Sequence, residues 1–215
     1  MIISKFTYIC VMIAVISGDI INSGNIASSK LMKTLKDFLK KYGSSPRNWE
    51  IFRGDQFQLE LTKHEEAFLL CVQLKALIKQ LGNIDVRIAI GIGEKTYSAP
   101  KITQSNGSAF VHSGRKFDLL KKENINLAIQ TDDEIFDAEM NLFFRFALVF
   151  MDEWSAVSCE IVHTLLSYPE KNQSEIAEIL GINQSAVSQR IRRANIDLLK
   201  DLNSHYISRV KQLLQ

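Results

Sequence analysis

Apolar and polar residues along this chain follow strand and helix periods in turn. Short apolar or alternating runs predict strands at residues 12–17, 49–53, 56–61, 85–92 and 125–130. Longer stretches with apolar residues three or four apart predict helices at 25–41, 65–81 and 107–121. The order is therefore βαββαβ followed by αβ. Its first six elements predict a ferredoxin-like sheet with helices on one face.

The remaining third of the chain has only helical patterns. Helices are expected at residues 134–150 and 153–166, and the phenylalanines of the first are expected in the core or a dimer interface. A last helix, 194–214, either continues the helix before it, with a break near Asn203, or packs as a dimerisation element. The predicted class is α+β, with a palm domain (1–133), a connecting helix (134–152) and an all-α helix-turn-helix domain (153–215).

Residues 172–193 carry the pattern of a helix-turn-helix. Asn172 is placed to cap a first helix, Gly181 to end it, and Asn183 to cap a second helix. Val187 and Ile191 give that second helix an inward stripe. The alternative is an amphipathic helical hairpin with a solvated polar face. Such a hairpin does not require the two caps, the turn glycine and the inward stripe together. The stretch resembles the helix-turn-helix of phage Cro repressors and of many bacterial regulators.

The outward side chains of the second helix suit DNA. Gln binds adenine, Ser binds either base type, and Arg reaches guanine or phosphate. No acidic residue lies within this helix, and residues 171–215 hold seven Lys or Arg against four Asp or Glu, which favours double-stranded DNA as the partner. The expected DNA-binding residues are Gln184, Ser185, Ser188, Gln189, Arg190, Arg192 and Arg193.

Composition and the N-terminus point to a globular protein of the cytoplasm. The chain is 46% hydrophobic and 23% charged, and its three scattered cysteines form no disulfide or metal pattern, which indicates a reducing compartment. The apolar stretch 6–16 is too short to span a membrane. We interpret it as a buried strand with an extension at residues 1–11, in preference to a signal peptide. Met12 is the alternative start.

Two Gly-Asp pairs mark candidate ligand residues. Asp19 follows the first predicted strand, and Asp55 lies at the bend between the second and third. Neighbouring first and third strands would bring both carboxylates to one end of the sheet, where they would bind Mg²⁺ or Mn²⁺ with a nucleotide. A glycine before each aspartate would let a ligand approach the backbone. The alternative is that both aspartates simply end strands, where they cap a helix and a turn.

These motifs resemble the catalytic palm of class III nucleotide cyclases. The matching segments are the apolar strand before Asp19-Ile20, the hairpin 54–57 (GDQF), the strand 87–93 (RIAIGIG) and the helix 107–115 (GSAFVHSGR). The resemblance implies metal-binding aspartates and a phosphate-facing Arg115, with Ser17 or Ser113 beside the ligand. The alternative for Arg115 is a salt bridge to Asp118.

Together with the helix-turn-helix, the motifs are more similar to the SatD family of bacterial proteins, over about residues 12–200. Val111 and Ile51 stand where cyclases have an asparagine and a lysine, so cyclase activity is not expected. The leading hypothesis is a homodimeric transcription regulator that senses a nucleotide or another phosphorylated ligand. The rival is a metal-dependent nucleotide-processing enzyme whose helix-turn-helix serves assembly.

Overall fold

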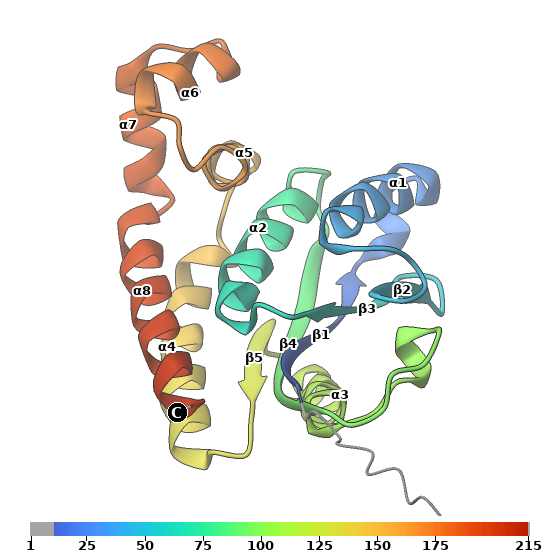
Figure 1. Ribbon diagram of the computed structural model, residues 1–215. Coiled ribbons are helices and arrows are strands. Elements are labelled where there is room, and N and C mark those ends of the chain that lie inside the picture. Colours follow the sequence, from blue (N-terminus) through green and yellow to red (C-terminus); the bar gives the residue numbers. More distant parts are fainter. Residues whose placement is uncertain (1–10, 215) are drawn as a thin grey trace, which may run out of the picture.

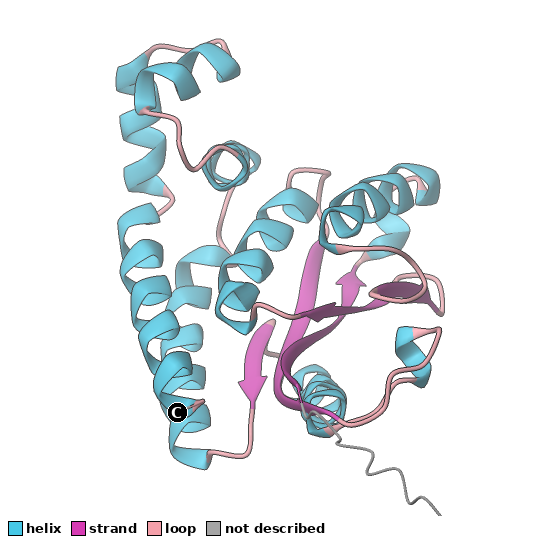
Figure 2. Cartoon of the chain, viewed as in Figure 1, coloured by secondary structure: helices cyan, strands magenta, loops and turns pink. Residues whose placement is uncertain are grey.

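A five-stranded sheet forms the centre of the molecule (Figure 2). The computed structural model describes residues 11–214 of the 215-residue chain. The strands lie in the order β2-β3-β1-β4-β5, with β5 parallel to β4 and the other neighbours antiparallel. Their bounds are β1 (Val11–Ile21), β2 (Trp49–Phe52), β3 (Gln56–Leu61), β4 (Asp85–Lys95) and β5 (Leu127–Gln130).

The first and third strands are neighbours, as the sequence predicts. Strand β1 is longer than the predicted 12–17, because it pairs with β4 at eleven positions from Val11 to Ile21. The expectation that Asp19 follows the strand is therefore wrong, since Asp19 lies inside β1 opposite Arg87. The predicted extension at residues 1–10 lies outside the described residues.

Helices cover both faces of this sheet (Figure 1). Helices α1 (Ser28–Leu39) and α2 (Ala67–Lys79) pack on one face, as predicted for the first six elements. Helix α3 (Ser108–Glu123) packs on the other. Alternate residues of β1 divide between the two faces because strand side chains alternate in direction: Ile16 contacts the first core, and Val15 the second.

Five helices follow the sheet: α4 (Glu134–Met151), α5 (Ala156–Ser167), α6 (Gln173–Leu180), α7 (Gln184–Arg193) and α8 (Ile196–Leu213). Helix α5 packs against α2, and α8 runs beside α4 (Figure 1). Asn195 has a left-handed backbone conformation and separates α7 from α8. The predicted break at Asn203 is wrong, because α8 is continuous through it.

Hydrogen bonds and ion pairs join these helices to one another and to the elements that precede them. Trp154 Nε1 donates to the Ala194 carbonyl at 3.1 Å, and Tyr206 Oη donates to the His64 carbonyl at 2.9 Å. Lys75 of α2 contacts two carboxylates: its Nζ lies 2.7 Å from Asp85 Oδ1 and 2.6 Å from Asp152 Oδ1. The contact with Asp152 is an ion pair without hydrogen-bond geometry. One apolar core extends from the sheet into α5–α8.

Candidate functional site

The helix ends around α6 and α7 form as their local sequence predicts. The Asn172 side chain accepts from the Ser174 and Glu175 amides, while Glu175 Oε2 accepts from the Asn172 amide at 2.8 Å, which completes a capping box. Gly181 ends α6 with a φ of 63°. The Asn183 side chain accepts from the Ala186 amide and caps α7. These contacts fix the turn between the two helices.

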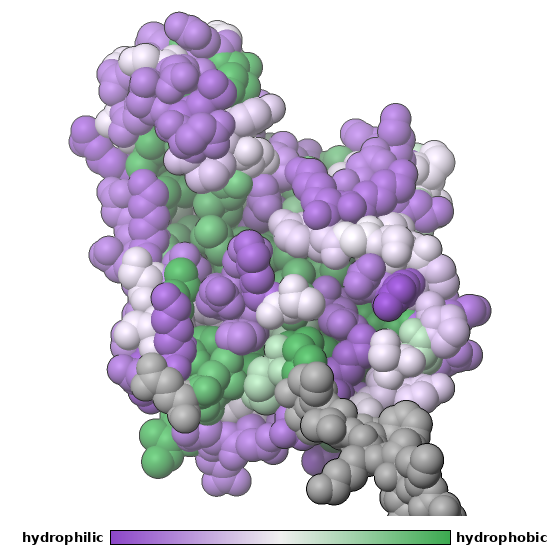
Figure 3. Space-filling view, in the orientation of Figure 1, coloured by the Kyte–Doolittle hydropathy of each residue, from purple (hydrophilic) through white to green (hydrophobic). Residues whose placement is uncertain are grey.

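The inward stripe of α7 is also present. Val187 and Ile191 are buried and join the main core, as does Ala177 of α6. Helix α7 packs on both α6 and α5. The opposite side of α7 is consequently turned outward, and the end of the molecule formed by α6 and α7 presents a mostly hydrophilic surface (Figure 3).

Most of the predicted DNA-binding side chains lie on that outward side. Gln184, Ser185, Gln189, Arg192 and Arg193 are exposed, whereas Ser188 and Arg190 are half-buried. Gln184 Nε2 donates to Gln173 Oε1 at 2.8 Å, and Ser185 Oγ donates to Asn183 Oδ1 at 2.8 Å.

The positive charge of α7 is partly compensated by a residue of another helix. Arg190 Nη1 donates to Glu160 Oε2 of α5 at 2.7 Å. Arg190 points toward α5 because it lies on the flank of α7 that this helix covers. Within residues 11–214, Arg192 and Arg193 form no ion pair, so the unpaired charge of α7 is at its C-terminal end.

The two predicted ligand aspartates lie near one end of the sheet. Asp19 is in β1, and Asp55 is half-buried in the hairpin loop between β2 and β3. Asp19 forms an ion pair with Arg87 of β4, whose Nη1 lies 3.1 Å from Oδ2 and 3.2 Å from Oδ1. Sequence reasoning missed Arg87 as a partner because only the β1–β4 register brings it opposite Asp19.

Burial raises the pKa of Asp19. The Arg87 guanidinium lowers that pKa, and the nearby Asp55 carboxylate raises it. Lys121 of α3 also lowers it. The geometry behind this interaction is the pairing of Gly18 with Phe57, which places Asp19 of β1 beside the start of β3, just after the loop that carries Asp55.

The glycines before these aspartates have different surroundings. A side-chain carbon at Gly18 would lie 2.5 Å from the Phe57 ring and 2.7 Å from the Arg87 carbonyl oxygen. Gly18 therefore serves packing within the sheet, and the expectation that it admits a ligand is wrong. Gly54 has a φ of +90° and open space beside it, as a residue of the hairpin loop requires.

Arg115 is exposed and, within residues 11–214, forms no ion pair with the two aspartates. Ser113 of α3 is buried against the sheet, where its Oγ donates to Ser17 Oγ at 2.6 Å. Arg115 is two residues further along α3, roughly 200° around a helix of 3.6 residues per turn, and so lies on the side turned away from Ser17. No ion pair joins Arg115 to Asp118 in the part of the chain that the structure describes.

The carboxylate pair does not by itself make up a metal centre. In the described range 11–214, no group of three His, Cys, Asp or Glu side chains is placed to hold a metal ion. Magnesium and manganese prefer several oxygen ligands, whereas one of the two carboxylates here already pairs with Arg87. A metal role for Asp19 and Asp55 stays a prediction.

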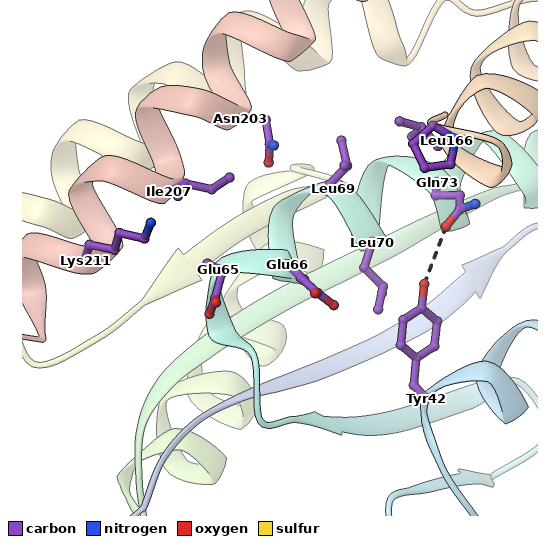
Figure 4. A pocket seen from close by; sticks show the side chains of 11 residues that line it. Tyr42, Glu65, Glu66, Leu69, Leu70, Gln73, Leu166, Asn203, Ile207 and Lys211 are labelled. Carbon is purple, nitrogen blue, oxygen red and sulfur yellow. Dashed lines mark hydrogen bonds between the residues drawn. The ribbon is translucent and has the colours of Figure 1, made fainter. Parts of the chain in front are cut away.

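A cavity of about 570 Å³ lies elsewhere, between α2 and α8 (Figure 4). Tyr42 Oη donates to Gln73 Oε1 at 3.5 Å beside it, and burial raises the pKa of Tyr42 to about 12. Glu65, Glu66 and Lys211 contribute charged groups to its lining. None of the residues predicted to bind DNA or ligand lines this cavity.

The structure is that of a mixed α+β protein with helices on both faces of its sheet. The chain belongs to the SatD family, whose family model matches residues 8–204. No curated protein matches it. Among solved structures, a bacterial light-regulated adenylyl cyclase is similar with a TM-score of 0.31 and 13% identity, over 56% of this chain and 43% of that one. The chain thus spans less than half of that structure, and a likeness at this level carries no functional argument. Within residues 11–214, no helix is both long and apolar enough to cross a membrane.

Proposed function

We propose that this SatD-family protein is a DNA-binding transcription regulator in which α6 and α7 form a helix-turn-helix. One observation carries the proposal: α7 is capped and buried on its Val187 side, while Gln189, Arg192 and Arg193 remain exposed on the other. A recognition helix needs this division, because base edges are read by free amide, hydroxyl and guanidinium groups. The hydrophilic surface over α6 and α7 (Figure 3) supports the same role.

The proposed division of the chain follows from this role. The sheet and helices up to residue 133, whose first four strands have the order β2-β3-β1-β4 of a ferredoxin-like sheet, would form a palm-like sensing domain in the cytoplasm. The helices after α4 would form the output domain. Lys75, Asp85 and Asp152 connect α2 and β4 to the end of α4, so a change at the sheet has a direct physical route to the C-terminal helices.

Binding of the full-length protein to DNA tests the proposal. The probe is a duplex selected from a random pool, and fluorescence anisotropy measures its affinity. We expect Gln189→Ala and Arg192→Ala each to weaken binding roughly ten-fold or more, because a base contact contributes about 1–3 kcal/mol. Lys33→Ala, which removes an exposed charge from α1, is the matched control and should bind like the wild type. If all three variants bound DNA as tightly as the wild type, the assignment of α7 as the recognition helix would be overturned.

A second candidate function is metal-dependent nucleotide binding at the sheet. The observation that favours it is the position of Asp19 in β1, next to the β2–β3 hairpin whose loop carries Asp55. Thermal shift with ATP or GTP and Mg²⁺ or Mn²⁺ tests it, because a ligand that binds the folded state raises its melting temperature. A shift that Asp55→Ala abolishes supports binding, and turnover of the nucleotide would favour the enzyme. If no combination of nucleotide and metal raises the melting temperature, these ligands are excluded for the site.

A further inference from the structure

Helix α4 is apolar on two opposite sides. Phe136, Met140 and Phe144 face the core and are fully buried. The opposite side carries a second apolar row, three or four residues apart, which we call the outer stripe: Ile135, Ala138, Leu142, Phe146 and Val149. The exposed fractions of its four large members are 78% for Ile135, 51% for Leu142, 63% for Phe146 and 73% for Val149. A helix that is apolar on all sides is ordinarily buried on all sides.

The apolar surface continues from α4 onto α8. Leu198 of α8 is 58% exposed, and a hollow of about 420 Å³ lies between the two helices beside Phe146. Phe143, Phe150 and Leu202 also line this hollow. Figure 3 shows hydrophobic surface near the end of the molecule where α4 begins. A contiguous exposed apolar surface of this kind marks an interface with another protein.

We propose that the outer stripe binds a second copy of this chain, with the two α4 helices antiparallel about a two-fold axis at Leu142. The stripe is self-complementary in this arrangement, as an interface between identical partners must be. Ile135 and Val149 lie at equal distances before and after Leu142. Ile135 of one copy therefore lies at the level of Val149 of the other. The small Ala138 likewise meets the level of the large Phe146.

The charges of α4 select the antiparallel direction. Arg145 is the only basic residue of the helix. Antiparallel packing places it along the N-terminal half of the partner helix, which begins at Glu134. Glu139 in that half already pairs with Arg209 and His205 of its own chain. Parallel packing would place Arg145 beside the partner's Arg145, and like charges repel. Opposed helix dipoles favour the antiparallel direction as well.

The stripe is long enough for a stable interface. Helix α4 has 18 residues, or about 27 Å at the rise of an α-helix. Burial of its outer side together with Leu198 approaches the roughly 800 Å² per partner of ordinary interfaces. The inference rests on the shape and charge of α4 and does not require that the protein bind DNA.

The mass of the full-length protein in solution tests the interface. Sedimentation analysis at micromolar concentrations should show a dimer for the wild type and a monomer for Leu142→Glu, because two carboxylates would meet at the axis. The variant should still unfold cooperatively, since Leu142 is half exposed. Its melting temperature should be lower than that of the wild type only by the contribution of the lost dimer. Leu119→Glu, at an exposed leucine of α3, is the matched control and should remain a dimer. A monomeric wild type, or a dimeric Leu142→Glu variant, would overturn the proposal.

Cross-linking tests the direction of the helices. In a Cys10→Ser background, whose other cysteines Cys71 and Cys159 are buried, Ile135→Cys and Val149→Cys proteins are treated with a short bis-maleimide. We expect cross-linked dimers in the mixture of the two variants and not in either alone. Cross-linking of Ile135→Cys to itself would overturn the antiparallel arrangement.

These measurements are made without DNA and so are separable from the test of the helix-turn-helix. A wild-type protein that is dimeric but binds no DNA would overturn the proposed function and support the interface. A wild-type protein that is monomeric but binds DNA through α7 would overturn the interface and support the proposed function.

Discussion

Gly91 holds α3 close to the sheet because its position has no room for a side-chain carbon. Such an atom would collide with the Ala109 carbonyl and the Ser113 amide of α3. The neighbouring Gly93 is crowded in the same way by Ser108. The two glycines of the segment RIAIGIG therefore have a packing role, which the sequence motif alone does not reveal.

Substitution of Gly91 tests this packing role. We expect Gly91→Ala to lower the free energy of unfolding by about 1–3 kcal/mol, the usual cost of overfilling a packed site. Gly114→Ala is the matched control within α3, where nothing lies within 4 Å of the added carbon. It should raise stability by about 0.5–1 kcal/mol, because Ala favours helix over Gly. Urea unfolding measures both, and equal effects would contradict the account.

Local signals were predictable at this scale, and long-range partners were not. Asn172, Gly181 and Asn183 act on backbone groups within four residues, so their roles follow from the sequence itself. Arg190 pairs with Glu160, thirty residues away, and Asp19 pairs with Arg87, 68 residues away. Only the packed fold brings such residues together.

At the scale of elements, α2 shows how a buried charge attaches helices to the sheet. Its sequence reads as an apolar helix, yet Lys75 within it is 2% exposed and contacts both Asp85 of β4 and Asp152 at the end of α4. The pattern of apolar residues predicts the helix but not this ion cluster, because the two acidic partners come from other elements.

Removal of the Lys75 ammonium should be costly. We expect Lys75→Met to lower the free energy of unfolding by about 1–3 kcal/mol, because it removes the ammonium that joins Asp85 to Asp152. Lys79 still pairs with Asp85, and Asp152 is partly exposed, which limits the loss. Lys63→Met removes a lysine that is 70% exposed and paired with Glu66, and should change stability by less than about 1 kcal/mol. Guanidinium unfolding followed by circular dichroism distinguishes the two. Similar losses of stability in the two variants would contradict the expectation that the buried lysine contributes more than the exposed one.

The strand boundaries show where element-scale prediction fails. Hairpin β2–β3 forms where its alternation and its Gly-Asp bend predict it. Strand β1 instead runs through Gly18-Asp19, because pairing with β4 continues to Ile21. The turn signal of Gly-Asp is overridden there by backbone hydrogen bonds to a distant strand.

At the scale of the whole molecule, one continuous core joins the sheet to the helical end of the chain. Residues of α5, α7 and α8 share that core with β1 and α2. The exposed polar groups of α7 and the outer stripe of α4 are both surfaces of this single body. A dimer through α4 would therefore fix the separation of two α7 helices, as the reading of paired half-sites requires.

The salt dependence of DNA binding tests the central claim most directly. The affinity of the full-length protein for a random-sequence duplex is measured by anisotropy over a range of salt concentrations. Each phosphate contact adds a slope of about 0.9 to the plot of log affinity against log salt. We expect Arg192→Ala to reduce the slope by about 1 and Lys33→Ala to leave it unchanged. Slopes that are the same for wild type and Arg192→Ala, or no binding by the wild type at low salt, would contradict the claim that α7 contacts DNA.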